Sequence, residues 1–362
     1  MSKNILEFCL SPDLGGLELF MVNSYKSFKQ KTSSKIIIAP NTKLDDYLKD
    51  EDDIFYIKRK KLFPFIPALK LAKYIDENKI DFIHFHWTKD IATVVLAKLL
   101  SKTKPKIIQT RHMTMTRFKD DSYHKWLYKN ISIIHTVTYQ VKDQIKKFIP
   151  SDIRPRVEAI HLGVQELSSN IDEVYKLKEK YSLKDDEFIV GIVGRIEDAK
   201  GQFLVIEAVK LLEDLNIKAI IVGHTMDEKY LNSLKQKVKD LNIEDKIIFT
   251  GFTKDVNTHM QVFDVNILAT PKETFGLVII EAMVNKVCVI ATNNGGPLEI
   301  IEDNQTGLLF NRTSKDLANK IKTLYKDPQL KKQIAQKGYE KALKDFNSTT
   351  QFEKLYKIIN ES

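Results

Sequence analysis

Cysteine is scarce in this chain: only Cys9 and Cys288 occur in 362 residues. They lie in apolar runs in separate halves, which excludes a disulfide framework and is typical of a reduced, cytoplasmic protein. No apolar run approaches the roughly 18 residues that a transmembrane helix needs. The first apolar run, "NILEFCL", is interrupted by Glu7 and no small-residue cleavage site follows it. We therefore expect neither a signal peptide nor a membrane span.

Several motifs that define other protein classes are also missing. Gly191 and Gly194 do not form the G-x-G-x-x-G pattern of a dinucleotide-binding dehydrogenase. The acidic stretches Glu51–Asp53 and Asp120–Asp121 do not follow a buried strand in a D-x-D pattern, so we expect solvated loops and no metal site. No recognition helix, zinc-ligand spacing or RNP-like strand is present, which argues against nucleic-acid binding.

The positive charge is unevenly distributed. Residues 1–170 carry 29 basic and 19 acidic side chains, whereas the rest of the chain carries 28 and 29. A basic first half suggests an anionic partner, either a membrane surface or a phosphorylated acceptor, although biased composition would also explain part of the excess.

Short apolar runs alternate with amphipathic helical patterns along most of the chain. Runs rich in Ile and Val without polar alternation are typical of strands buried on both faces, and their alternation with helices predicts parallel sheets. The runs in question are "NILEFCL", "KIIIAP", "DFIHFH", "KIIQT", "IIHTVT", "VEAIHL", "FIVGIVG", "KAIIVG", "KIIFTG", "DVNILAT" and "VCVIAT". The predicted fold class is α/β, with two doubly wound, Rossmann-like domains.

The alternation stops once, between Gln165 and Asp186, in a polar stretch that precedes a fresh strand. We therefore predict an N-terminal domain over residues 1–165 and a C-terminal domain over residues 166–345. The helix at about 346–362 is expected to pack back on the first domain. Two such domains in tandem would place a ligand cleft between them, at the carboxyl ends of both sheets.

Two cations follow the strand "FIVGIVG": Arg195 and Lys200, the latter just before Gly201 and a helix. Fixed positive charge at the exit of a strand suits a diphosphate, since it stabilises a leaving phosphate.

The segment "PKETFGLVIIEAM" adds two carboxylates, Glu273 and Glu281. Pro271 ends a buried strand, and a helix is predicted from about Phe275 to Asn285. The first-turn N–H groups of a helix attract an anion such as a phosphate. Carboxylates on both sides of such a site suit a ligand that also carries hydroxyl groups, meaning a sugar and a ribose.

Together, "GRIEDAKG" and the E-x7-E segment with "TFGL" inside it resemble the retaining glycosyltransferases of the GT4 type (glycosyl transferases group 1), which have the GT-B fold. The segments "GGLE", "DFIHFHWTKD" and "NNGGPLEIIEDNQTGLLF" extend the resemblance over nearly the whole chain. Thr274 departs from the family pattern, where glycine is common, and His161 stands where asparagine is usual.

The resemblance implies a role for each matching residue. Arg195 and Lys200 would bind the donor diphosphate and stabilise it as it leaves, Glu273 would bond the hydroxyls of the donor sugar, and His86 would lie near that sugar. The remaining donor contacts would come from the backbone amides of Phe275, Gly276 and Leu277, the carboxylate of Glu281, and the N-terminal loop at Gly15 and Gly16. No metal or other cofactor is implied, because two cations and a helix N-terminus can replace a divalent ion.

The acceptor is expected on the basic N-terminal domain. Arg111 and His112, after a predicted strand end, are candidate contacts for an acceptor phosphate or carboxylate. The segment from Ile57 to Lys70, "IKRKKLFPFIPALK", combines cations with Phe63 and Phe65 and suits an anionic bilayer. An ordinary exposed turn before an amphipathic helix would explain the same sequence.

The predicted activity is transfer of a sugar from a nucleotide-diphosphate sugar to a glycan or lipid-linked acceptor in bacterial surface polysaccharide or lipopolysaccharide synthesis. The protein is expected in the cytoplasm or on the cytoplasmic face of the inner membrane. A sugar-nucleotide epimerase of the same fold and a non-catalytic sugar-nucleotide binding protein stay open as alternatives.

Overall fold

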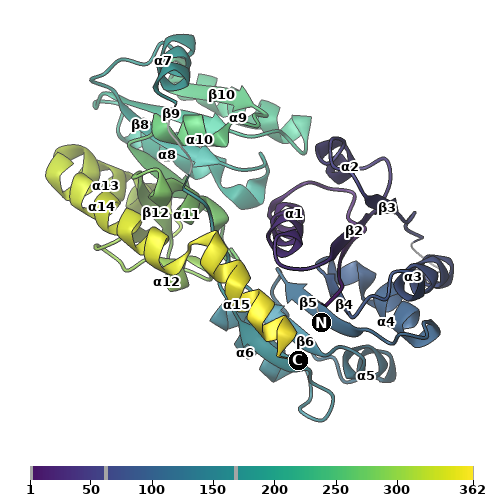
Figure 1. Cartoon of the computed structure of the whole chain (residues 1–362). Coiled ribbons are helices and arrows are strands. Elements are labelled where there is room, and N and C mark those ends of the chain that lie inside the picture. The colour runs from purple at the N-terminus through teal and green to yellow at the C-terminus, as the bar shows by residue number, and fades with distance from the viewer. Residues whose placement is uncertain (1–2, 61–63, 167–169, 362) are drawn as a thin grey trace. The chain divides into compact units, whose positions relative to one another are not determined.

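The computed structural model describes residues 3–60, 64–166 and 170–361. The chain divides into two compact units (Figure 1). Unit 1 comprises Met1–Leu162 together with Ser348–Ser362, and unit 2 comprises Gly163–Asn347. Each unit is built on one sheet whose described strands all run parallel, as the sequence predicts.

The sheet of unit 1 has the strand order β3-β2-β1-β4-β5-β6-β7. Its strands are β1 (Ile5–Cys9), β2 (Ser34–Ile38), β3 (Ile54–Tyr56), β4 (Phe82–Phe85), β5 (Lys106–Arg111), β6 (Ile133–Thr136) and β7 (Arg156–Ala159). Its helices are α1 (Gly16–Lys29), α2 (Lys43–Tyr47), α3 (Phe65–Glu77), α4 (Ile91–Leu100), α5 (Ser122–Lys129), α6 (Tyr139–Phe148) and α15 (Ser348–Asn360), with a 3-10 turn, η1 (Thr88–Asp90).

Side chains of β1 alternate between the two faces of this sheet, because successive residues of a strand point to opposite sides. Leu6 and Phe8 join the core that α3 and α4 cover, whereas Cys9 joins a second core with residues of α1 and α2. Helix α15, the yellow C-terminal helix in Figure 1, packs against α1. The chain ends meet there, since Lys3 Nζ donates to the carbonyl oxygen of Asn360 over 2.6 Å.

The sheet of unit 2 has the strand order β10-β9-β8-β11-β12-β13. Its strands are β8 (Phe188–Val193), β9 (Ile217–Val222), β10 (Ile247–Gly251), β11 (Val265–Leu268), β12 (Cys288–Thr292) and β13 (Leu308–Phe310). Its helices are α7 (Ile171–Lys180), α8 (Gln202–Leu211), α9 (Glu228–Asp240), α10 (Val256–Gln261), α11 (Leu277–Val284), α12 (Pro297–Ile300), α13 (Ser314–Lys326) and α14 (Pro328–Asp345). The 3-10 turns are η2 (Asp198–Lys200) and η3 (Glu244–Lys246).

The direction of winding reverses once in each sheet. The reversal lies between β1 and β4 in unit 1, and between β8 and β11 in unit 2. Loops that leave the carboxyl ends of such a strand pair diverge, and ligands of open parallel α/β sheets bind in the crevice between them. Each unit thus has one preferred place for a ligand.

Four elements differ from the sequence-based expectation. Strands β3 and β13 have only three residues each and were not predicted. The polar stretch after Gln165 contains helix α7, whose buried residue is Leu177. The helix predicted from about Phe275 begins later, at Leu277.

Within the described part of the chain, no helix combines the length and apolar character that crossing a bilayer requires.

Candidate active site

The winding reversal of unit 2 brings Lys200 and Glu273 together. Lys200 ends η2 after β8, and Glu273 follows the neighbouring strand β11. The Nζ atom of Lys200 lies 3.2 Å from Oε2 of Glu273, and the two side chains stay 25% and 21% exposed. A partly exposed ion pair of this kind is worth only about 0–1 kcal/mol of stability. The pair therefore contributes little to stability, and both side chains are accessible to a ligand.

Glycines of the "NNGGPLE" segment fix the loop that carries Glu273. The N–H of Gly296 donates to the carbonyl oxygen of Glu273 over 2.9 Å. A Cβ atom added at Gly296 would lie 2.4 Å from the backbone of Phe275, closer than any side chain tolerates. The glycine is therefore needed for the close approach of two loops, and the position of Glu273 depends on it.

Helix α11 starts beside this loop with an open N-terminus. Its N-cap is Gly276, in the left-handed region at φ 99°, where glycine is favoured, and no side chain caps it. In the described residues, the N–H groups of Leu277 and Val278 have no hydrogen-bond partner. Free first-turn donors at the positive end of a helix form an anion site. The predicted amide of Phe275 lies before this turn, and its ring packs inward against Phe346 at a centroid distance of 6.0 Å.

Arg195 lies at the exit of β8, but within the described residues its side chain pairs with neither Lys200 nor Glu273. Its guanidinium is half exposed and pairs with Glu197 over 3.1 Å. Its carbonyl oxygen accepts from the buried side chain of Gln202 over 2.9 Å, which fixes the backbone. In the described chain, no hydrogen bond or ion pair joins Arg195 to Lys200 or Glu273.

Glu281 occupies the second turn of α11 and is half-buried. Burial raises the pKa of its carboxyl group to about 7. Its carboxylate has no hydrogen bond or ion pair among the residues that the structure describes. A carboxyl group without an internal partner is available to the hydroxyl groups of a ligand.

The winding reversal of unit 1 holds Gly15, Gly16 and His86. Gly15 is the N-cap of α1, and its N–H donates to Oε2 of Glu18 over 2.9 Å. A Cβ atom at Gly15 would meet only that oxygen, at 3.5 Å, so the backbone is open to a ligand on this side. Gly16 is the first residue of the helix.

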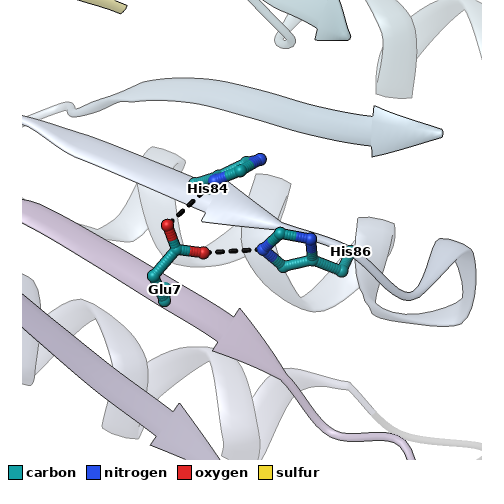
Figure 2. Close-up of side chains that lie close together, drawn as sticks. All are labelled: Glu7, His84 and His86. Atoms are coloured by element: carbon teal, nitrogen blue, oxygen red, sulfur yellow. Dashed lines mark hydrogen bonds and ion pairs between the residues drawn. The ribbon is translucent and has the colours of Figure 1, made fainter. Parts of the chain in front are cut away.

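His86 lies just beyond β4 and is 1% exposed. Its Nε2 atom lies 2.6 Å from Oε2 of Glu7, a carboxylate from the middle of β1. Figure 2 shows that His84 contacts the other oxygen of the same carboxylate, with its Nδ1 atom 3.0 Å from Oε1. The Nδ1 atom of His86 is buried and has no hydrogen-bond partner among the residues that the structure describes. Burial lowers the pKa of His86 to about 4, so its ring is neutral at pH 7.

The two predicted acceptor contacts, Arg111 and His112, have different environments. Arg111 is buried and donates to the carbonyl oxygens of Met113 and Thr114 and to the hydroxyl of Thr88, so it holds its own loop in place. His112 packs edge-on against Phe20, at a centroid distance of 5.2 Å. Its Nε2 atom is buried, with no hydrogen-bond partner in the described part of the chain. Burial lowers its pKa well below the usual value. Their roles toward an acceptor stay predictions.

Glu7 and His84 were not identified from the sequence as site residues. Within the described residues, the group Glu7, His84 and His86 has the spacing that a metal ion would need. Its facing atoms are already used in hydrogen bonds to one another, and we assign no metal to it. A glutamate inside an apolar strand and two histidines at i and i+2, which point to one face of a strand, were the available signals.

Comparison with known proteins decides the family. Residues 174–341 match the family model described as "Glycosyl transferases group 1", and residues 7–140 match that of "Glycosyl transferase 4-like". The chain belongs to the group 1 glycosyltransferases. The two matches fall on the two units and include Glu7, Lys200 and Glu273.

Individual relatives agree with this assignment. The chain is 27% identical to the putative glycosyltransferase EpsD of Bacillus subtilis (strain 168), over 95% of this chain and 93% of that protein. It is 29% identical to the capsular polysaccharide biosynthesis glycosyltransferase CapM of Staphylococcus aureus, over 51% of this chain and 49% of that protein. Its fold matches that of Anabaena HepE in complex with UDP-glucose, with a TM-score of 0.86 and 21% identity over 99% of this chain and all of that one.

The predicted fold class is thereby confirmed: this group 1 glycosyltransferase has two Rossmann-like sheets and the GT-B fold. The activity class, glycosyl transfer, is confirmed as well. The roles assigned to single residues stay predictions, as does the expected absence of a metal requirement.

Proposed function

We propose that this glycosyltransferase moves a sugar from a nucleotide-diphosphate sugar to a glycan or lipid-linked acceptor, with retention of the anomeric configuration. The observation that carries the proposal is the contact of Lys200 with Glu273 beside the open N-terminus of α11. A cation and free helix amides suit a diphosphate, and an adjacent carboxylate suits the hydroxyls of the sugar attached to it. The match to a protein crystallised with UDP-glucose supports a nucleotide sugar as donor.

In the proposed reaction, the bond between the anomeric carbon and the diphosphate oxygen breaks, and a bond to the acceptor oxygen forms on the same face. The proton of the acceptor hydroxyl passes to the departing phosphate oxygen, so no separate general base is required. Lys200, Arg195 and the amides of Leu277 and Val278 stabilise the charge that develops on the diphosphate. Glu273 orients the sugar, and the unpartnered carboxylate of Glu281 accepts hydrogen bonds from the ribose.

The acceptor belongs, in this proposal, to bacterial surface polysaccharide or lipopolysaccharide synthesis. The support is the similarity to CapM of Staphylococcus aureus and the basic first half of the chain.

A membrane-facing surface on unit 1 is part of the same proposal. Helix α3 exposes Phe65, Ile66 and Leu69, which are 52%, 46% and 45% exposed, next to lysines of the same helix. Exposed apolar side chains beside cations suit shallow insertion into an anionic bilayer. Phe63, which the sequence also suggests for this surface, lies outside the described residues.

The test starts with a thermal-shift panel of nucleotide-diphosphate sugars, because a ligand that binds the folded state raises Tm. The stabilising donor is then incubated with candidate acceptors, and the released nucleoside diphosphate and the transferred sugar are quantified. Diphosphate release that depends on the acceptor indicates transfer, whereas conversion of the donor sugar without acceptor would indicate an epimerase. Binding without any product would indicate a binding protein.

Substitutions at the site make the test specific. We predict that Lys200→Ala and Glu273→Ala each lower kcat/KM by about 100-fold or more, since each removes a group that acts on the transition state. The matched controls are Lys210→Ala and Glu213→Ala, which remove a pair at the end of α8 away from β11. Unchanged transfer in either site variant, with the controls also unchanged, would contradict the proposal.

A further inference from the structure

Two cations lie against the indole ring of Trp87, a half-buried residue that follows β4. The guanidinium carbon of Arg59 lies 4.4 Å from the centroid of the ring, and Nζ of Lys89 lies 5.1 Å from it. The ring attracts both cations through its π electrons, although the two positive charges repel each other. Trp87 itself packs against the core that contains Cys9, so this core holds the ring in place.

The cluster of Arg59, Trp87 and Lys89 lies at the carboxyl edge of the sheet of unit 1. Arg59 follows β3 and Trp87 follows β4, while β2 and β1 lie between these strands in the sheet. The contact of Arg59 with Trp87 therefore joins two loops across the carboxyl ends of β2 and β1, beside the winding reversal where ligands of such sheets bind. Just before Arg59, Ile57 is fully buried and donates its N–H to the carbonyl oxygen of Ile38 over 3.0 Å, which fixes this segment.

The turn η1, which carries Lys89, is fixed by hydrogen bonds to residues that follow or end other strands. Asp90 is 1% exposed, and its Oδ2 atom accepts from the N–H of Leu10, just beyond β1, over 2.8 Å. The hydroxyl of Thr88 accepts from Nη1 of Arg111, at the end of β5, over 3.2 Å. These bonds order the backbone of η1 without any ligand.

No ion pair compensates the two cations in the part of the chain that the structure describes. Neither Arg59 nor Lys89 forms a hydrogen bond or an ion pair with a described residue. Asp90 is the acid nearest in effect, but burial raises its pKa to about 7, against the lowering effects of its backbone hydrogen bond and of Arg59. Lys58 and Lys60, both exposed, add positive charge to the same segment. The surface over Trp87 is therefore strongly basic and accessible to an anion.

The two cations match a doubly charged phosphate group better than a carboxylate. The guanidinium of Arg59 presents a planar fork of N–H donors that suits phosphate oxygens, and the ammonium of Lys89 adds a compact charge. A phosphate monoester carries about −1.5 to −2 charges at pH 7, and a diphosphate diester carries a negative charge on each phosphate. A carboxylate carries a single charge.

A group of the acceptor fits this position better than the surface of a bilayer. Arg59 and Trp87 are half-buried at the edge of the sheet, whereas Phe65 of α3 is 52% exposed. Insertion into a bilayer requires side chains that project from the surface, as Phe65 does. The cluster over Trp87 is therefore distinct from the membrane-facing surface on α3.

We propose that Arg59 and Lys89, held against Trp87, bind a doubly charged phosphate or diphosphate group of the acceptor. The inference rests on the proposed function, which makes the ligand of unit 1 an acceptor, and it names the chemistry of the acceptor's charged end. Arg111 is a positioning residue in this arrangement, since it acts through Thr88 on the turn that carries Lys89.

Tryptophan emission reports on this site directly, because the chain contains only Trp87 and Trp126. The Trp126→Phe protein keeps Trp87 as its single tryptophan, and Lys200→Ala in the same protein weakens pyrophosphate binding at the proposed donor site. At constant ionic strength, titration with inorganic pyrophosphate should give a saturable change in the emission of Trp87. Absence of a saturable change would overturn the proposal.

Single substitutions in this protein identify the residues that bind pyrophosphate. Arg59→Gln and Lys89→Gln should each weaken the apparent affinity by about tenfold, since each removes a charged donor. The matched control is Lys147→Gln, which also removes a cation from an aromatic ring, that of Phe148 on α6 at 5.3 Å, and should leave the affinity unchanged. Equal affinity in the control and in both site variants would overturn the proposal.

Kinetics with the acceptor found in the transfer assay connect the anion site to the reaction. In the otherwise unchanged protein, Arg59→Gln should raise KM for the acceptor by about tenfold and leave KM for the nucleotide sugar unchanged. An unchanged acceptor KM would overturn the assignment of the site to the acceptor.

Vesicles separate an acceptor from a bilayer, and the possible failures are distinguishable. If phosphatidylglycerol vesicles change the emission of Trp87 and pyrophosphate does not, the cluster faces a membrane and the proposal is wrong. Absence of transfer from every nucleotide sugar, with the pyrophosphate response intact, would instead contradict the proposed function while supporting the anion site.

Discussion

At the scale of single residues, each unit has polar groups near its winding reversal that lack an internal partner among the described residues. Glu281, the amides of Leu277 and Val278, and Nδ1 of His86 have no hydrogen-bond partner within the described residues. Buried or half-buried polar groups are normally paired, because leaving one unpaired costs roughly 1–3 kcal/mol. Ligands bound at the winding reversals would supply partners for these groups.

Glu281 provides a pH-dependent test of ribose binding. Its carboxyl pKa is raised to about 7, and hydroxyl donors bind the ionised form. The affinity for a nucleotide-diphosphate sugar should therefore increase from pH 6 to pH 8. Titration calorimetry with the intact sugar nucleotide suits the measurement, because its diester phosphates stay ionised over this range.

The matched variants are Glu281→Gln and Glu340→Gln. We expect Glu281→Gln to weaken binding by about tenfold at pH 8 and to remove the pH dependence. Glu340, on the exposed side of α14, should be replaceable without effect. A pH profile that is the same in wild type and Glu281→Gln would rule out this role.

The elements were predictable to different degrees. Buried parallel strands such as β1 and β8 were identified because they are continuous apolar runs. Strand β3 was not, since three residues at a sheet edge, mostly exposed, carry no periodic signal. Helix α7 was missed because it buries little more than Leu177 in a polar stretch.

The information that a single sequence carries also explains which site residues could be predicted from it. Lys200 and Glu273 each follow a predicted strand end, and neighbouring parallel strands bring their carboxyl ends together. The hydrogen bonds that join Glu7, His84 and Thr110 depend on the register of three strands that are far apart in sequence. Sequence reasoning on one chain does not supply that register, so these contacts were not predicted.

The close packing of the Gly296 loop against the loop that carries Glu273 predicts the effect of a substitution at Gly296. Gly296→Ala would push a methyl group against the backbone of Phe275, and overpacking of this kind costs about 1–3 kcal/mol. We expect the calorimetric transition of unit 2 to fall by roughly 2–10 °C, with a loss of transfer activity because Glu273 moves. Gly15→Ala is the control, since the added Cβ atom makes only an ordinary van der Waals contact. An equal drop in Tm for both variants would contradict the packing argument.

At the scale of the whole molecule, the two units should respond to acid in opposite directions. His86 and His135 of unit 1 are buried and neutral, with pKa values lowered to about 4 and 3. The unfolded chain therefore binds more protons below pH 6.5, and the stability of unit 1 falls as pH decreases from 6.5 toward these values. Glu281 of unit 2 has a raised pKa, so its contribution to stability increases as pH decreases from about 7 to 4.5.

Hydrogen exchange measured segment by segment reports on each unit separately, so it measures the difference in their response to acid. Between pH 7.5 and 5, corrected for the intrinsic exchange rate, we expect protection in β4–β6 to fall by more than protection in β11 and β12. A His135→Gln variant removes one of the buried histidines, so its acid response should be weaker. A larger loss of protection in unit 2 than in unit 1 would contradict the assignment of neutral buried histidines.

In the proposed function, a nucleotide diphosphate binds where β8, β11 and α11 meet. Hydrogen exchange with and without saturating nucleoside diphosphate tests it most directly. We expect new protection at residues 194–201 and 273–279, with no effect in the Lys200→Ala variant at the same ligand concentration. Protection confined to other segments, or unchanged protection in Lys200→Ala, would contradict it.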